Sequence, residues 1–93
     1  MLSQIPLNLQ KVSKENLDRE ILRVGMIAEL DAVNLYEQLA AMTEDPNIKR
    51  ILTDIAKEEK THVGEFQALL LEKDIEQVKE LEEGKKEVKE LTE

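Results

Sequence analysis

The order of apolar and polar positions predicts a long amphipathic helix over residues 13–43, with Ser13 as its N-cap. Two neighbouring apolar stripes run along it, which is more than one partner helix covers, so the pattern favours association with other chains. The first stripe, which only Asp31 interrupts, comprises Leu17, Ile21, Val24, Ala28, Leu35, Leu39 and Met42. The second comprises Leu22, Met26, Glu29, Val33, Tyr36 and Ala40, with Glu29 as its one carboxylate.

A second helix is predicted over residues 45–72, directly after a tight turn. Asp45 suits the N-cap, and Pro46 suits the first helical position, where its missing N–H would be unpaired in any case. The opposite face is rich in charged residues, so the apolar stripe marks the inward side. That stripe, spaced alternately four and three apart, comprises Ile48, Leu52, Ile55, Glu59, His62, Phe66 and Leu69. Glu59 and His62 are therefore predicted to lie in the seam between helices.

A third, shorter helix is predicted over residues 74–84, with Asp74 as N-cap, Gln77 as its reciprocal capping partner and Gly84 at the C′ position. Residues 85–93, in which Val88 and Leu91 keep helical spacing, are predicted to be either another turn or two of helix or a tail or linker. Residues 1–12 form an N-terminal arm, which frays or docks on a neighbour through its aliphatic side chains. Those side chains are Leu2, Ile5, Leu7 and Leu9. The prediction is one all-α domain over residues 1–93, an antiparallel hairpin with a short extra helix.

Composition and charge narrow the function classes. The chain has 93 residues, no cysteine and a formal net charge of −8 from 21 acidic and 13 basic residues. The missing cysteines exclude disulfides and thiolate metal sites and suit a cytoplasmic protein. The acidic surface disfavours nucleic acid and anionic lipid and concentrates cations. Because no signal peptide or apolar span is recognisable, no membrane partner is expected.

The hairpin places three candidate ligands at one height. Because antiparallel pairing about the turn sets residue i opposite about residue 88 − i, Glu29 lies level with Glu59, and His62 lies about 4.5 Å further along. Two buried carboxylates side by side repel each other, and a cation between them removes that cost. Carboxylate and imidazole donors suit iron, manganese or zinc. One chain holds half the ligands of a two-metal centre, so two chains are predicted to share one.

Ordinary explanations exist for each residue alone. Glu29 could pair with Arg23 or Lys60, and a lone core histidine is commoner than a ligand. Only the combination in one seam favours a metal.

Two further residues have open roles. Tyr36, two turns from Glu29, is either a redox or hydrogen-bonding neighbour of the ligands or a tyrosine at the edge of the core. Asp31 either binds a second cation near the main site or faces a wet channel. Gly25 and Gly64 suggest a close backbone approach or an open space, because glycine costs about 1 kcal/mol in a helix.

Residues 27–37 (IAELDAVNLYE) and 58–66 (EEKTHVGEF) resemble the encapsulated ferritin family, and most of all the N-terminal domain of archaeal encapsulin fusions. The resemblance implies a ferritin-like four-helix unit made by dimerisation, with a di-iron ferroxidase centre at its interface, and dimers that close into a decameric ring. It implies iron ligands at Glu29, Glu59 and His62, with Glu59 as a bridge and Tyr36 as a neighbour. It also implies an encapsulin shell as partner, fused or separate, and a location inside that nanocompartment.

The resemblance has two departures. Many relatives have tryptophan where Leu35 stands and a second acid where Ala28 stands, which leaves Asp31 as the main candidate for an entry-site cation. The segment 85–93 does not look like a cargo peptide, so a domain of a longer fused protein is one explanation.

The function predicted is a ferroxidase that turns Fe(II) into Fe(III) for iron storage or detoxification. Manganese, zinc or calcium could take the place of iron. One alternative is a non-catalytic metal-bridged assembly or cargo-docking module. Another is a rubrerythrin-like peroxidase, which the missing cysteines disfavour.

Overall fold

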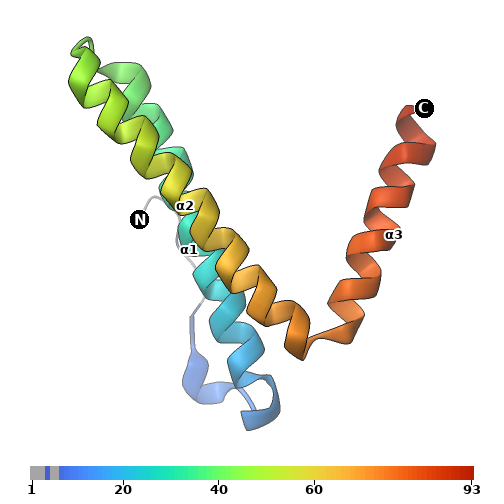
Figure 1. The fold of residues 1–93 in the computed structure, drawn as a ribbon. Helices are drawn as coiled ribbons and strands as arrows, with labels where there is room; N and C mark the ends of the chain where they lie inside the picture. The colour runs from blue at the N-terminus through green and yellow to red at the C-terminus, as the bar shows by residue number, and fades with distance from the viewer. Residues whose placement is uncertain (1–3, 5–6) are drawn as a thin grey trace.

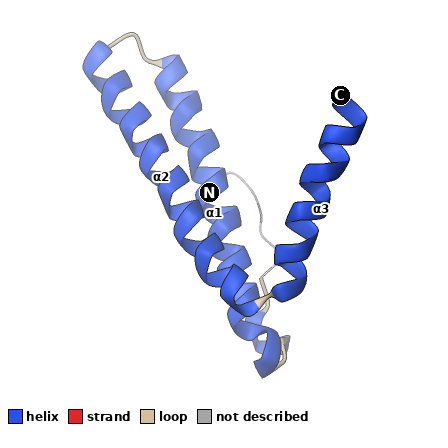
Figure 2. Ribbon diagram, turned by 45° about the vertical axis from the view of Figure 1, so that its right-hand side comes forward, coloured by secondary structure: helices blue, strands red, loops and turns tan. Residues whose placement is uncertain are grey.

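The computed structural model describes residue 4 and residues 7–93, and this part of the chain is helical without strands. A single 3-10 turn, η1 (Leu9–Lys11), precedes three α-helices, α1 (Lys14–Met42), α2 (Pro46–Lys73) and α3 (Ile75–Thr92). Figure 1 shows α1 and α2 side by side as an antiparallel hairpin, with α3 diverging from its lower end, and Figure 2 shows the same V from another side. The all-α prediction is confirmed. The predicted docking of Leu2 and Ile5 lies outside the described residues.

Capping side chains set where the hairpin turns. Asp45 has extended backbone angles, and its side chain accepts hydrogen bonds from the backbone N–H groups of Asn47 at 2.8 Å and Ile48 at 3.0 Å. Pro46 follows at the first helical position, where no hydrogen bond is lost. Ser13 occupies the N-cap position of α1 but makes no side-chain capping bond. Within the described residues, no helix is long and apolar enough to cross a membrane.

The predicted end of the third helix near Gly84 was wrong, because α3 continues to Thr92. Residues 85–92 therefore match the alternative of further helical turns and not that of a tail or linker. Among the described residues none has a positive φ, so Gly84 does not adopt the left-handed C′ conformation. A glycine inside a helix costs only about 1 kcal/mol, and the Lys- and Glu-rich sequence around it has high helix propensity. The Lys86–Glu83 pair at 3.4 Å adds a contact one turn apart.

The core of the protomer is thin. Its buried apolar side chains are Leu22, Val33, Ala40, Ala56 and Leu70. Several residues of the predicted inward stripes are instead exposed, including Leu39, Ile48 and Leu69, the last at 50%. A two-helix hairpin can cover only the strip where its helices meet, so the remaining apolar positions stay in water. Exposed apolar surface of this extent is typical of a chain that associates.

Gly25 lies where the Phe66 ring of α2 comes close to the backbone of α1. A Cβ atom built on Gly25 would lie 2.9 Å from the Phe66 ring, whereas one on Gly84 would meet nothing within 4 Å. Gly25 therefore lets α1 and α2 approach each other at Phe66, as the close-approach prediction for this position expected.

Substituting Gly25 tests that contact. Gly25→Ala gains about 1 kcal/mol of helix propensity but forces the Phe66 ring to move, and overpacking of this kind costs about 1–3 kcal/mol. We expect a net loss of up to about 2 kcal/mol in urea unfolding. The matched control is Gly84→Ala, which adds the same methyl group without a clash and should be neutral or stabilising. Equal stabilisation by both substitutions would contradict the close contact.

Asp74 gives the fold a pH dependence that can be measured. The hydrogen bond from the Gln77 backbone N–H lowers the pKa of the Asp74 carboxyl below its usual 3.8, with the Arg23 guanidinium acting in the same direction and burial opposing them. Because the folded pKa is the lower one, the stabilisation is complete above 3.8 and is lost as pH falls through the depressed folded value.

Melting curves from neutral to acidic pH check this. Asp74→Asn keeps the capping oxygen but removes the charge, so its melting temperature should lie below that of the unsubstituted protein at neutral pH and converge with it in acid. Asp45→Asn is the control, because Asp45 also caps a helix but has no ion pair in the described part of the chain. A constant difference at every pH would contradict the role of the charge.

Candidate metal centre

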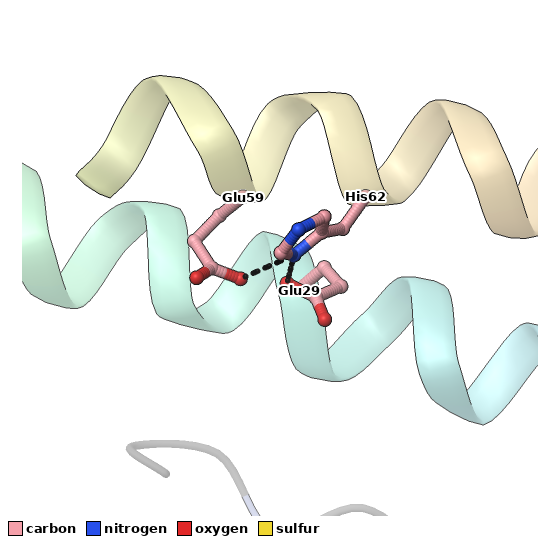
Figure 3. Close-up of side chains that lie close together, drawn as sticks. All are labelled: Glu29, Glu59 and His62. Atoms are coloured by element: carbon pink, nitrogen blue, oxygen red, sulfur yellow. Dashed lines mark hydrogen bonds and ion pairs between the residues drawn. The ribbon is translucent and has the colours of Figure 1, made fainter. Parts of the chain in front are cut away.

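Three side chains from the two long helices converge on one point (Figure 3). Glu29 comes from α1, and Glu59 and His62 come from α2. The His62 Nδ1 atom lies 3.3 Å from an Oε2 atom of Glu29 and 3.4 Å from Oε2 of Glu59. One donor atom from each residue fits within 4.8 Å of the others. The hairpin thus brings together the three residues that the sequence predicted to share one height.

Local structure accounts for this convergence. Glu59 and His62 are three residues apart on α2, so they lie on the same side of that helix one turn apart. The short turn at Asp45 and Pro46 fixes the antiparallel register that sets Glu29 of α1 opposite them. Neither loop nor terminus contributes to the group, so two packed helices hold its geometry.

Nearby cations do not neutralise these carboxylates. Arg23 pairs with Asp74 at 3.1 Å, and Lys60 pairs with Glu37 at 3.3 Å. Both partners that the sequence offered Glu29 are therefore engaged elsewhere. In the part of the chain that the structure describes, the ion pairs of Glu29 and Glu59 are both with His62.

The donor set suits a divalent metal. The side chains of Glu29 and Glu59 are only 20% and 18% exposed, so their mutual repulsion is weakly screened. A single Nδ1 atom can carry at most one proton for the two of them. A cation between two carboxylate oxygens and an imidazole nitrogen meets both carboxylates at once, and these donors suit iron, manganese or zinc. The residues present therefore fit a bound metal ion.

The group is open on one side. His62 is 44% exposed, whereas both carboxylates lie deeper. Ile51 and Leu69 lie eleven residues before and seven after His62, spacings that place all three on the same face of α2. Both are exposed, at 60% and 50%. Three donors also leave room in the coordination shell of a six-coordinate metal. Two uncovered apolar side chains thus lie on the same face of α2 as the site, about 16 Å before it and about 10 Å after it along the helix, and form an apolar rim at either end.

The two residues with open roles, Tyr36 and Asp31, are not members of the converging group of three donors. Tyr36 is half-buried on α1, and its predicted part beside the ligands stays a prediction. Asp31 is 6% exposed, which differs from the alternative of a side chain in a wet channel, and the entry-site cation stays a prediction too. Gly64 is exposed, and a Cβ atom built on it would meet no atom within 4 Å, which agrees with the open-space alternative for this glycine.

The ion pair between Arg23 and Asp74 was not predicted from the sequence. They lie 51 residues apart, and no local spacing relates them. A pairing of this kind follows only from the packed structure.

Comparison with known proteins agrees with this architecture. A family model described as EncFtn-like matches residues 5–83. A ferritin-like-encapsulin shell fusion protein of Pyrococcus furiosus is 64% identical over 80 residues, which are 86% of this chain and 23% of that protein. An encapsulin nanocompartment cargo protein of Myxococcus xanthus, EncC, is 35% identical over 75 residues, 81% of this chain and 57% of that protein.

A solved structure is similar along almost the whole chain. The crystal structure of an encapsulated ferritin domain from Pyrococcus furiosus superposes with a TM-score of 0.85 at 56% identity, covering 99% of this chain and 96% of that one. The chain spans about a quarter and just over half of the two curated relatives, 23% and 57% of their lengths. A family model that covers most of the chain, together with this structural match, shows that the protein belongs to the EncFtn-like family.

Proposed function

We propose that the protein is a ferroxidase, which oxidises Fe(II) with dioxygen at a di-iron centre shared between two copies of the chain. The observation that carries this proposal is the convergence of Glu29, Glu59 and His62 at the open edge of the hairpin. Two carboxylates and one imidazole from each copy make the donor set of ferritin-like di-iron proteins.

Sharing of the centre follows from what one chain lacks. A single protomer offers three donors and leaves them open beside exposed apolar side chains. A second copy related by a two-fold axis would cover the rim formed by Ile51 and Leu69 and bring an equal set of donors. Glu59 is the proposed bridge between the two ions. Dimerisation would then bury the rim and complete the metal site at the same time.

The residues of the chain suit an oxidation in which the charge on the metal increases. Carboxylates favour a trivalent over a divalent ion, because their attraction grows with its charge. Each Fe(II) ion gives up one electron, and dioxygen takes up two electrons and two protons to become hydrogen peroxide, or four of each to become water. The net charge of −8 raises the local concentration of Fe(II) around the protein.

An encapsulin compartment is the proposed setting. The two curated relatives are named as a ferritin-like-encapsulin shell fusion and an encapsulin cargo protein. We propose that this chain likewise works inside an encapsulin shell in the cytoplasm, fused or separate, with dimers assembled into a decameric ring. Because an open ring of hairpins encloses no storage cavity, the oxidised iron would be stored as mineral in the compartment.

A second candidate, a metal-bridged assembly without catalysis, has its own support. The thin core and the exposed apolar rim favour association of the protomer whether or not the metal site is catalytically active. In that case the ion would only stabilise the dimer.

Substitution of the ligands tests the catalytic proposal. Glu59→Gln and His62→Ala should each slow Fe(II) oxidation by at least about 100-fold, because loss of a donor changes metal affinity and geometry together. Stopped-flow absorbance and an oxygen electrode give the rate. Glu58→Gln is the matched control, because Glu58 precedes Glu59 on α2 but is exposed. This variant should oxidise iron at the normal rate. Normal rates in both ligand variants would contradict the assignment.

Mass measurement separates the two candidates. Under anaerobic conditions, Fe(II) should shift the protein toward an even-numbered assembly in native mass spectrometry, and a chelator should reverse the shift. The His62→Ala variant should not respond. Association with Fe(II) followed by no oxygen uptake in air would favour the metal-bridged assembly. Peroxide consumption faster than oxygen consumption would favour a peroxidase instead.

A further inference from the structure

The bend between α2 and α3 consists of a single residue. Asp74, with φ −139° and ψ 87°, separates Lys73 at the end of α2 from Ile75 at the start of α3. The surrounding sequence, residues 71–77 (LEKDIEQ), contains neither glycine nor proline. Helical angles at Asp74 would therefore join α2 and α3 into one continuous helix. The contacts that Asp74 makes in its present conformation favour the bend over a continuous helix.

Both carboxylate oxygens of Asp74 are engaged. Oδ1 accepts a hydrogen bond from the Gln77 backbone N–H at 3.0 Å, which caps α3. Oδ2 accepts one from Nη2 of Arg23 at 3.1 Å, which connects the joint to α1. The Asp74 side chain is 10% exposed and that of Arg23 is 47% exposed. A charge-assisted hydrogen bond with one partner out of water is stronger than a surface ion pair.

Packing alone does not fix the direction of α3. The helix has no buried residue, its backbone comes close to that of α2 at few positions, and it does not come close to the backbone of α1. Figure 1 shows α3 leaving the hairpin, so that its far end stands clear of it. A groove of about 310 Å³ lies on the inside of the bend, with an apolar lining from all three helices. That lining includes Met26, Ile27, Leu30, Leu70, Leu71 and Leu81.

We propose that the Arg23–Asp74 pair is a clamp that holds α3 folded back toward α1, and that breaking it lets α3 straighten onto the end of α2. With the clamp closed, Leu81 of α3 faces the apolar residues of the hairpin across the groove. With it open, the groove loses its α3 wall. The clamp shares no residue with the metal centre, so this inference does not rest on the proposed function.

Distance measurement between two spin labels tests the clamp. The chain has no cysteine, so Lys57→Cys on α2 and Glu90→Cys on α3 give two unique labelling sites at exposed positions. Labelled chains are mixed with an excess of unlabelled ones, so that pulsed electron resonance reports distances within one chain. If α2 and α3 were a single helix, the labels would lie about 50 Å apart. The folded-back arrangement gives a shorter distance.

Two single variants and their combination complete the design. Arg23→Ala should raise the share of the long distance by about fivefold or more, as expected for loss of a partly buried ion pair. Asp74→Asn, which keeps the capping oxygen, should act alike, and the double variant should add nothing further. Circular dichroism verifies that each variant keeps its helices.

Controls make the outcome decisive. Lys73→Met removes the neighbouring Lys73–Asp18 pair at 3.9 Å and should leave the short distance dominant. An unchanged distance distribution in Arg23→Ala, or additive effects in the double variant, would overturn the clamp. The readout needs no iron, so failure of the proposed ferroxidase activity would leave this result unaffected.

Discussion

Electrostatic repulsion between the largely buried carboxylates of Glu29 and Glu59 is the constraint on which the candidate site depends. Glu29 and Glu59 are held within reach of the same imidazole nitrogen, in a seam where water screens their charges poorly. Arg23 and Lys60, whose positive charges could have offset this repulsion, are each paired with another acid. Holding these two charges close together costs free energy in the hairpin, and a divalent ion bound between them would remove that cost.

The thinness of the core and the openness of the site have a common origin. Two helices meet along one strip, and that strip buries only a small apolar core for a domain of this size. The site lies at the edge of the strip, with His62 half exposed beside apolar residues. Small domains commonly gain stability from a metal or from association. In this chain both would act on the same face of the hairpin.

Some of this could be predicted from the sequence, and the rest required packing. The periodicity of apolar residues predicted the hairpin and the position of Glu59 and His62 in its seam, because spacing along a helix decides which side a residue lies on. It could not tell whether an apolar position such as Leu69 is covered by its own chain. The helix end predicted at Gly84 was wrong, because the preference of glycine for a helix end is weak when strong helix formers surround it. The Arg23–Asp74 contact joins residues too distant for any local pattern to relate.

The contact of Gly25 with Phe66 completes the account of how the site is positioned. Gly25 lies four residues before Glu29 on α1, and Phe66 lies four residues after His62 on α2, so the contact is one helical turn from the site on both helices. The absence of a side chain at Gly25 lets the Phe66 ring lie against the α1 backbone. Because helices are stiff over one turn, the spacing fixed there also sets how closely Glu29 of α1 approaches Glu59 and His62 of α2. An apolar contact outside the charged group thus helps to set the distance between its α1 and α2 members.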